Sequence, residues 1–120
     1  MAEGEWIHKR HGIGQIAWRR GIGGSAEITN LDVDPGKRRQ GHGRMLVFHV
    51  LKHCRGNPPH AVYGFTSADN DIAHRFYGAL GFLLFPVRPL CPGGAVLFCQ
   101  EYAKLMLQME RIERGLAGSG

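Results

Sequence analysis

The chain has 120 residues, of which 43 % are hydrophobic and 21 % charged, and its formal net charge at pH 7 is +5. This length and composition predict one globular domain with its own core and exclude a disordered chain. We expect that domain over residues 1–116 and a flexible tail over residues 117–120. Neither a secretory signal nor a membrane-spanning apolar run of roughly 20 residues is present, so a cytoplasmic protein without membrane partners is expected.

The first third of the chain predicts an antiparallel meander. Residues 5–9 and 13–19 are rich in Ile and Trp and are separated by a glycine turn, which favours a hairpin. Residues 26–33 predict a third strand that ends at a Pro-Gly turn. The apolar positions of this strand change parity between Ile28 and Leu31, which indicates a β-bulge.

The rest of the chain predicts helices alternating with strands. Helices are expected at 44–53, 70–80 and 101–116, and strands at 61–66, 82–85 and 95–100. The second helix should bury a face formed by Ile72, Phe76 and Leu80. Asp69 or Asn70 is its expected N-cap, and Gly81 is expected just after its C-terminus. The order β-β-β-α-β-α-β-β-α, with one parallel crossover in a mostly antiparallel sheet, predicts a mixed α/β (α+β) fold.

The last predicted helix carries an apolar stripe. Its members are Leu105, Met109, Ile112 and Leu116. Such a stripe usually covers the core of its own domain, and a dimer contact is the alternative.

The sharpest local feature is a basic, glycine-rich turn between a strand and a helix, Lys37-Arg-Arg-Gln-Gly-His-Gly-Arg44. Glycines let the backbone fold tightly with its N–H groups outward, and a helix N-terminus favours negative charge. The turn therefore predicts an anion site that would accommodate a diphosphate, and a solvated basic turn is the alternative. The dinucleotide fingerprint is absent, because it would need glycine where Leu46 stands.

This turn resembles motif A of the GNAT acyl-CoA N-acyltransferases, a V-x-P strand end followed by Q/R-x-x-G-x-G/A. Here the motif stands as Val33-Asp-Pro35 and Arg38-Arg-Gln-Gly41-His-Gly43. A second family pattern, N-x-x-A-x-x-x-Y followed by G-F, is also present. It consists of Asn70, Ala73, Tyr77, Gly81 and Phe82. The two motifs occur in the family's order, and the resemblance covers roughly residues 5–102.

The resemblance implies an N-acetyltransferase that uses acetyl-CoA as co-substrate and no metal. The strand around Leu31, Asp32 and Val33 would hydrogen-bond the pantetheine arm, and Asn70 would contact the pantetheine or the diphosphate. The backbone of the basic turn would wrap the pyrophosphate of coenzyme A. The residues implied to do so are Arg38, Arg39, Gln40, Gly41, His42, Gly43 and Arg44.

Two residues are candidates for catalysis. Glu27 would take a proton from the attacking amine, and its alternative is an exposed strand residue paired with Arg19 or Arg20. Tyr77 would protonate the departing thiolate, since a phenol of pKa about 10 can supply a proton, and its alternative is packing at a helix end. Strict alternation would place Glu27 and Val33 on one face of the strand, whereas a bulge would separate them.

The acceptor side of the site stays open. Members of the family begin with a strand and two helices before the first hairpin, and we expect this chain to lack them. A small molecule or a protein that bears an amine fits as acceptor, and a homodimer is a way to complete the pocket. The alternatives to catalysis are a non-catalytic acyl-CoA-binding or regulatory module and a basic nucleic-acid-binding protein, for which no motif is present.

The histidines and cysteines add no further site. His49 and His53 have the i, i+4 spacing of metal ligands, but no third ligand accompanies them, so no metal is expected. Cys54, Cys91 and Cys99 form no C-x-x-C pair and are expected to be free thiols.

Overall fold

A computed structural model of the chain describes residues 14–33, 41–87 and 94–118. The strands within these ranges are β1 (Gly14–Arg20), β2 (Ala26–Val33), β3 (Ala61–Ser67), β4 (Leu83–Val87) and β5 (Ala95–Glu101). The helices are α1 (His42–His53), α2 (Asp71–Ala79) and α3 (Tyr102–Gly118), with short 3-10 turns η1 (Ile22–Gly24) and η3 (Cys54–Gly56). The strand predicted over residues 5–9 lies outside the described residues.

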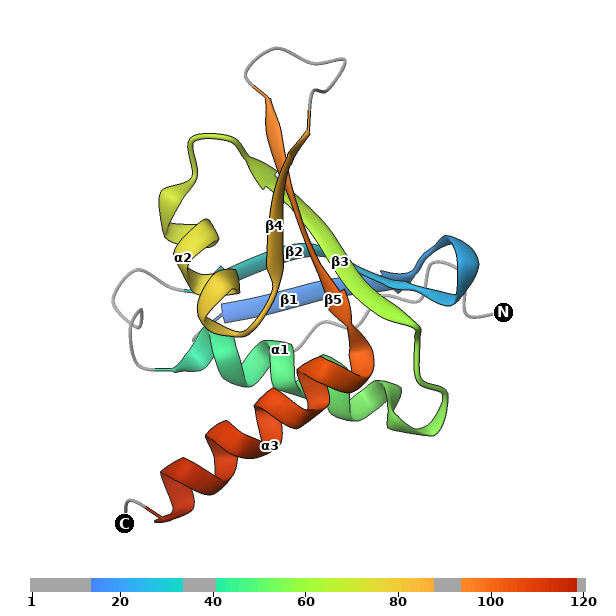
Figure 1. The fold of residues 1–120 in the computed structure, drawn as a ribbon, viewed down its shortest axis with the longest axis vertical. Helices are drawn as coiled ribbons and strands as arrows, with labels where there is room; N and C mark the ends of the chain where they lie inside the picture. Colours follow the sequence, from blue (N-terminus) through green and yellow to red (C-terminus); the bar gives the residue numbers. More distant parts are fainter. Residues whose placement is uncertain (1–13, 34–40, 88–93, 119–120) are drawn as a thin grey trace.

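The strands form one mixed sheet in the order β1-β2-β3-β5-β4. β2 and β3 pair in parallel and are connected by the crossover helix α1. The other neighbouring strands pair antiparallel. In Figure 1, β1 and β2 run across behind β3, β5 and β4, with α2 beside the sheet and α1 and α3 below it. The mixed α/β fold predicted from the sequence is therefore confirmed.

The predicted bulge in β2 is present. Ala17 pairs with Asn30 and Trp18 with Ile28, so Thr29 is the extra residue. The bulge brings Leu31 onto the face that Ile28 occupies, where both contact the hydrophobic core. Without the bulge, the side chains of Leu31 and Val33 would project from the opposite face of the sheet, away from the core.

One hydrophobic core joins all three helices to a single face of the sheet. Trp18 of β1 and Phe98 of β5 are its largest fully buried side chains. Leu105 and Met109 of α3 are buried in the same core, so this helix covers its own domain as predicted. The side chain of Leu116 lies outside the described residues.

The predicted apolar face of α2 is wrong at one position. Ile72 is 67 % exposed, whereas Tyr77 and Leu80 are buried and Phe76 packs against the core. The helix is turned by the stacking of Tyr77 on Phe98, whose ring planes differ by 9° at a centroid distance of 3.7 Å. This orientation leaves Ile72 in the first turn, directed away from the sheet.

The ends of α2 follow the predicted signals. Asn70 is the N-cap, and Gly81 follows the C-cap with a φ of 102°, in the left-handed region that glycine tolerates. Cys54 and Cys99 form no disulfide bond, and Cys91 lies outside the described ranges. Among the described residues, no helix is long and apolar enough to cross a membrane.

Candidate functional site

A gap opens in the middle of the sheet between β2 and β3. The parallel pairing of these strands joins only Ala26 to Val62 and Glu27 to Tyr63. Beyond that point β2 continues for six residues paired with β1 alone. The predicted binding strand, Leu31 to Val33, belongs to this part of β2. An extended molecule can therefore pair with β2 as an added strand would, because backbone hydrogen-bonding groups line a strand edge.

The N-terminus of α1 has no side-chain cap. Gly41 is the N-cap residue, with a φ of 81°, and no side chain forms a capping hydrogen bond there. The first turn holds no acidic residue among those described, and the Arg44 guanidinium lies 3.2 Å from where a Cβ on Gly41 would stand. The first N–H groups of a helix lack intrahelical partners and carry partial positive charge, so this end favours an anion.

α1 meets α2 and β2 at a second glycine of the turn. A Cβ on Gly43 would lie 3.0 Å from the Phe76 ring and 3.7 Å from the Val33 side chain. The space that a side chain would need is thus already filled by α2. Glycine at this position lets the predicted anion site of α1 approach the end of β2, which does not pair with β3.

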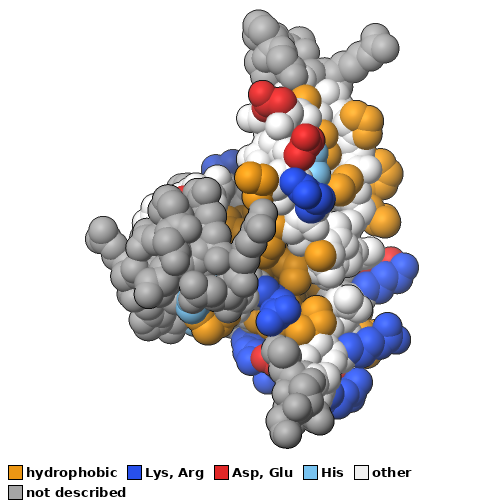
Figure 2. All heavy atoms as spheres, turned by 90° about the vertical axis from the view of Figure 1, so that its left-hand side faces the viewer, with side chains coloured by type: hydrophobic (Ala, Val, Ile, Leu, Met, Phe, Trp, Pro, Cys, Tyr) orange, Lys and Arg blue, Asp and Glu red, His pale blue; other side chains and the backbone are white. Residues whose placement is uncertain are grey.

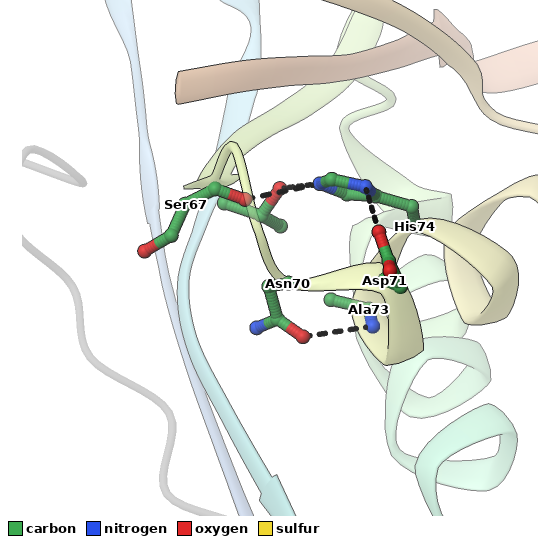
Figure 3. Close-up of polar contacts among 6 residues, drawn as sticks. Ser67, Asn70, Asp71, Ala73 and His74 are labelled. Atoms are coloured by element: carbon green, nitrogen blue, oxygen red, sulfur yellow. Dashed lines mark hydrogen bonds and ion pairs between the residues drawn. The ribbon is translucent and has the colours of Figure 1, made fainter. Parts of the chain in front are cut away.

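The start of α2 lies where β3 ends, on the far rim of the gap. The side-chain oxygen of Asn70 accepts a hydrogen bond of 3.1 Å from the backbone N–H of Ala73 (Figure 3). The His74 ring ties the helix to the strand, because its Nε2 lies 2.9 Å from the Thr66 hydroxyl and 3.1 Å from the Ser67 carbonyl oxygen. The cap leaves the amide N–H₂ of Asn70 available for a ligand.

Tyr77 is buried one helical turn further along α2, among aromatic rings. It stacks on Phe98 and meets Phe76 and Phe82 edge to face, at 5.0 and 5.5 Å. Burial raises the pKa of Tyr77 well above its usual value. The hydroxyl therefore stays protonated at neutral pH and can donate a hydrogen bond, while proton release from it is disfavoured.

Glu27 lies on the face of the sheet opposite to the helices, with only 15 % of its side chain exposed. Its Oε1 accepts hydrogen bonds from Arg19, at 2.9 Å from Nη2 and 3.0 Å from Nε. The Tyr63 hydroxyl also bonds to Glu27, and burial followed by the Glu27 charge raises the pKa of Tyr63. The ion pair with Arg19 is the one that the sequence analysis gives as an alternative to catalysis.

The bulge at Thr29 separates Glu27 from Val33, as the parity argument anticipated. Glu27 faces away from the helices, whereas Val33 packs against the core. The Glu27 carboxylate and the Val33 side chain therefore lie on opposite faces of the sheet.

The predicted site residues that the structure describes lie on β2, in the first turn of α1 and on α2. His42 begins α1, Asn70 caps α2, and Asp32 is exposed at the end of β2. Arg38, Arg39 and Gln40 lie outside the described residues. Sequence reasoning missed Tyr63 and His74, because their partners are set by the register of β2 against β3 and by the docking of α2 onto β3.

Comparison with known proteins gives a family. Residues 8–82 match the profile of the acetyltransferase (GNAT) family, which is more than half of the chain. A comparison with functionally curated proteins gives no match.

Three solved structures illustrate the similarity in fold. Ard1 from Thermoplasma volcanium is 28 % identical over 74 % of this chain, with a TM-score of 0.65. Arabidopsis thaliana Naa50, in complex with the bisubstrate analogue CoA-Ac-MVNAL, is 25 % identical over 73 % of the chain, with a TM-score of 0.61. The PaiA N-acetyltransferase of Thermoplasma acidophilum, in complex with coenzyme A, is 19 % identical over 75 %, with a TM-score of 0.63. The chain spans 62 %, 64 % and 54 % of these three proteins, respectively.

Proposed function

The chain belongs to the acetyltransferase (GNAT) family, and from this we propose that it transfers an acetyl group from acetyl-CoA to a primary amine by direct attack. The observation that supports this most is the end of the β2–β3 pairing at Glu27 and Tyr63. Beyond this point β2 and β3 no longer pair. The N-terminus of α1 would then lie on one side of the bound cofactor and the Glu27 carboxylate on the other.

The residues of the gap suit the parts of acetyl-CoA. The first N–H groups of α1, with Gly41 and Arg44, would hold the pyrophosphate, because an uncapped basic helix start attracts phosphate. The end of β2, residues 31–33, would hydrogen-bond the pantetheine as a strand does. Asn70 would donate its amide N–H₂ to the same arm while its oxygen caps α2.

The reaction needs a neutral amine and a leaving thiolate. The amine nitrogen forms a bond to the thioester carbonyl carbon, the carbon–sulfur bond breaks, and the amine loses a proton. Glu27 would take that proton directly or through water. Tyr77 would stabilise the departing sulfur as a hydrogen-bond donor, since the raised pKa disfavours complete proton transfer from it.

A calorimetric titration with acetyl-CoA, followed by mass spectrometry of added amines, tests this function. We expect saturable one-to-one binding by acetyl-CoA, none by AMP, and a product heavier by one acetyl group. Binding without any acetylated product would instead indicate a non-catalytic acyl-CoA-binding module. Absence of binding would contradict the proposed function altogether.

A further inference from the structure

The face of the sheet opposite to the helices carries a continuous row of apolar side chains, here called the apolar face. It consists of Tyr63, Phe65, Leu83, Phe85, Leu97 and Cys99. The strand register aligns them, because Tyr63 and Leu83 both pair with Cys99, and Phe65 and Phe85 both pair with Leu97. Residues directly opposite one another in a sheet project from the same face.

The apolar face is accessible to solvent in the part of the chain that the structure describes. Phe65 is 55 % exposed, Leu83 52 % and Phe85 46 %. The helices bury their side chains against the other face, on Val62 and Phe98. Figure 2 shows hydrophobic side chains following one another along the β4 side of the molecule, with Lys and Arg gathered below them over α3. A contiguous exposed apolar patch of this kind is typical of a binding surface.

The apolar face is continuous with the proposed amine position. Tyr63 bonds to Glu27 on one side and meets the Phe65 ring edge to face on the other, at 6.1 Å. The β2–β3 pairing stops at Glu27 and Tyr63, so Phe65, the next residue of β3 on this face, borders the gap. A group attached to an amine beside Glu27 would therefore lie against Phe65.

The charge near the gap favours an acceptor whose amine lies beside Glu27. The Glu27 carboxylate adjoins the apolar face, and Arg19 is its ion-pair partner at 2.9 Å. The residues of the apolar face carry no charge, and the other carboxylates of this side of the sheet, Asp32 and Glu101, are exposed at strand ends. An acceptor with an ammonium group and a bulky apolar substituent complements both features.

From this arrangement we propose that the acceptor is an amine whose amino group is attached to a bulky apolar side group, and that Phe65 determines this specificity by packing against that group. An amino acid amide or a peptide N-terminus with a large apolar first residue has this chemistry. The inference rests on the proposed function and adds the class of acceptor to it.

The test measures kcat/KM with acetyl-CoA and four amines: glycinamide, leucinamide, phenylalaninamide and spermidine. Burial of a large apolar side chain should raise kcat/KM for phenylalaninamide about 10- to 100-fold over glycinamide. Phe65→Thr, which keeps a strand-forming residue, should remove most of this preference and change the glycinamide value less than about 2-fold. Phe65→Leu should retain most of the preference.

The matched control is Leu107→Gln, which removes an apolar side chain of similar exposure, 56 %, from α3. It should leave all four kcat/KM values unchanged. Circular dichroism and acetyl-CoA affinity verify that each variant is folded.

Three results would overturn the inference in distinguishable ways. Equal kcat/KM for glycinamide and phenylalaninamide, or a preference for spermidine, would refute the acceptor class and leave the transferase function standing. No turnover of any amine would refute the transferase function itself, and the acceptor class with it. A dimer in sedimentation that Phe65→Thr dissociates, without altering the amine preference, would assign the apolar face to contact between two copies.

Discussion

The helix-covered face of the sheet buries Trp18 and Phe98 completely or almost completely, whereas the opposite face leaves Phe65 and Leu83 about half exposed. Backbone geometry dominates on the covered side, where Gly41 and Gly43 bring a helix start to the end of β2, which does not pair with β3. Side-chain chemistry dominates on the open side, where an ion pair adjoins an apolar row. The difference fits the proposal that the covered side binds the cofactor and the open side the acceptor.

The largest expected effect follows from a change at the proposed phosphate position on the covered side of the sheet. Gly41→Asp should lower acetyl-CoA affinity more than about 100-fold, because it places a carboxylate at the proposed phosphate position and a side chain at a φ of 81°. Gly56→Asp is the control, since a Cβ there would meet nothing within 4 Å and it lies beyond the other end of α1. Calorimetry measures both, and retained affinity in Gly41→Asp would refute the placement of the pyrophosphate.

The next effect separates the two sides. Glu27→Gln should lower kcat about 100-fold or more while acetyl-CoA affinity stays within about 2-fold, because a base on the open face does not contact the cofactor. Glu113→Gln removes a carboxylate from an exposed ion pair with Lys52, at 2.8 Å, and should change neither quantity. Unchanged turnover in Glu27→Gln would favour the purely structural ion pair with Arg19.

A third change tests the close packing around Gly64 of β3. A Cβ on Gly64 would lie 2.3 Å from the Phe98 ring and 2.7 Å from the Ile28 carbonyl oxygen. Gly64→Ala should therefore lower the free energy of unfolding by about 1–3 kcal/mol. Gly78→Ala in α2, where the nearest atom of Leu84 is 3.8 Å away, should raise it by up to about 1 kcal/mol. Urea denaturation measures both, and equal effects would contradict the close approach at Gly64.

A smaller effect is expected at the rim of the gap. Asn70→Ala should cost about 1 kcal/mol of stability through loss of the helix cap, and should also weaken acetyl-CoA binding. Asn70→Asp keeps a capping oxygen and removes the amide donor, so it should restore stability without restoring affinity. Recovery of both properties in Asn70→Asp would show that Asn70 is a cap alone.

The smallest expected effect on stability at neutral pH concerns the Tyr77 hydroxyl. Its pKa is raised in the folded protein, so the unfolded chain loses this proton first as the pH rises. The stability that this group contributes is complete below about pH 10, the unfolded pKa, and is lost as the pH rises above it. Thermal unfolding from pH 7 to 11 should thus show a smaller alkaline decrease in Tyr77→Phe than in the natural sequence. Parallel decreases would contradict a buried hydroxyl.

Much of the covered side was predictable because short-range signals encode it. The Asn70 cap, Gly81 after α2 and the bulge in β2 each depend on residues close in sequence, and the structure has them where the sequence indicates. The predicted face of α2 failed at Ile72, because helical periodicity does not reveal which stripe the stack with Phe98 selects.

The open side was much less predictable. The pairing of Tyr63 with Glu27 depends on the register between two parallel strands, which neither strand encodes alone. Phe65 and Phe85 become neighbours of Leu97 only once β3 and β4 both pair with β5. Arg19 was a named partner of Glu27 because a hairpin register lies within reach of sequence reasoning.

We propose that acetyl-CoA binds between β2 and β3 and at the start of α1. Amide hydrogen exchange, with and without acetyl-CoA, tests it most directly. We predict protection in residues 28–33 and 41–45, and no change in β5 at residues 95–101. Protection of β5 instead, with residues 28–33 and 41–45 exchanging as before, would contradict the claim.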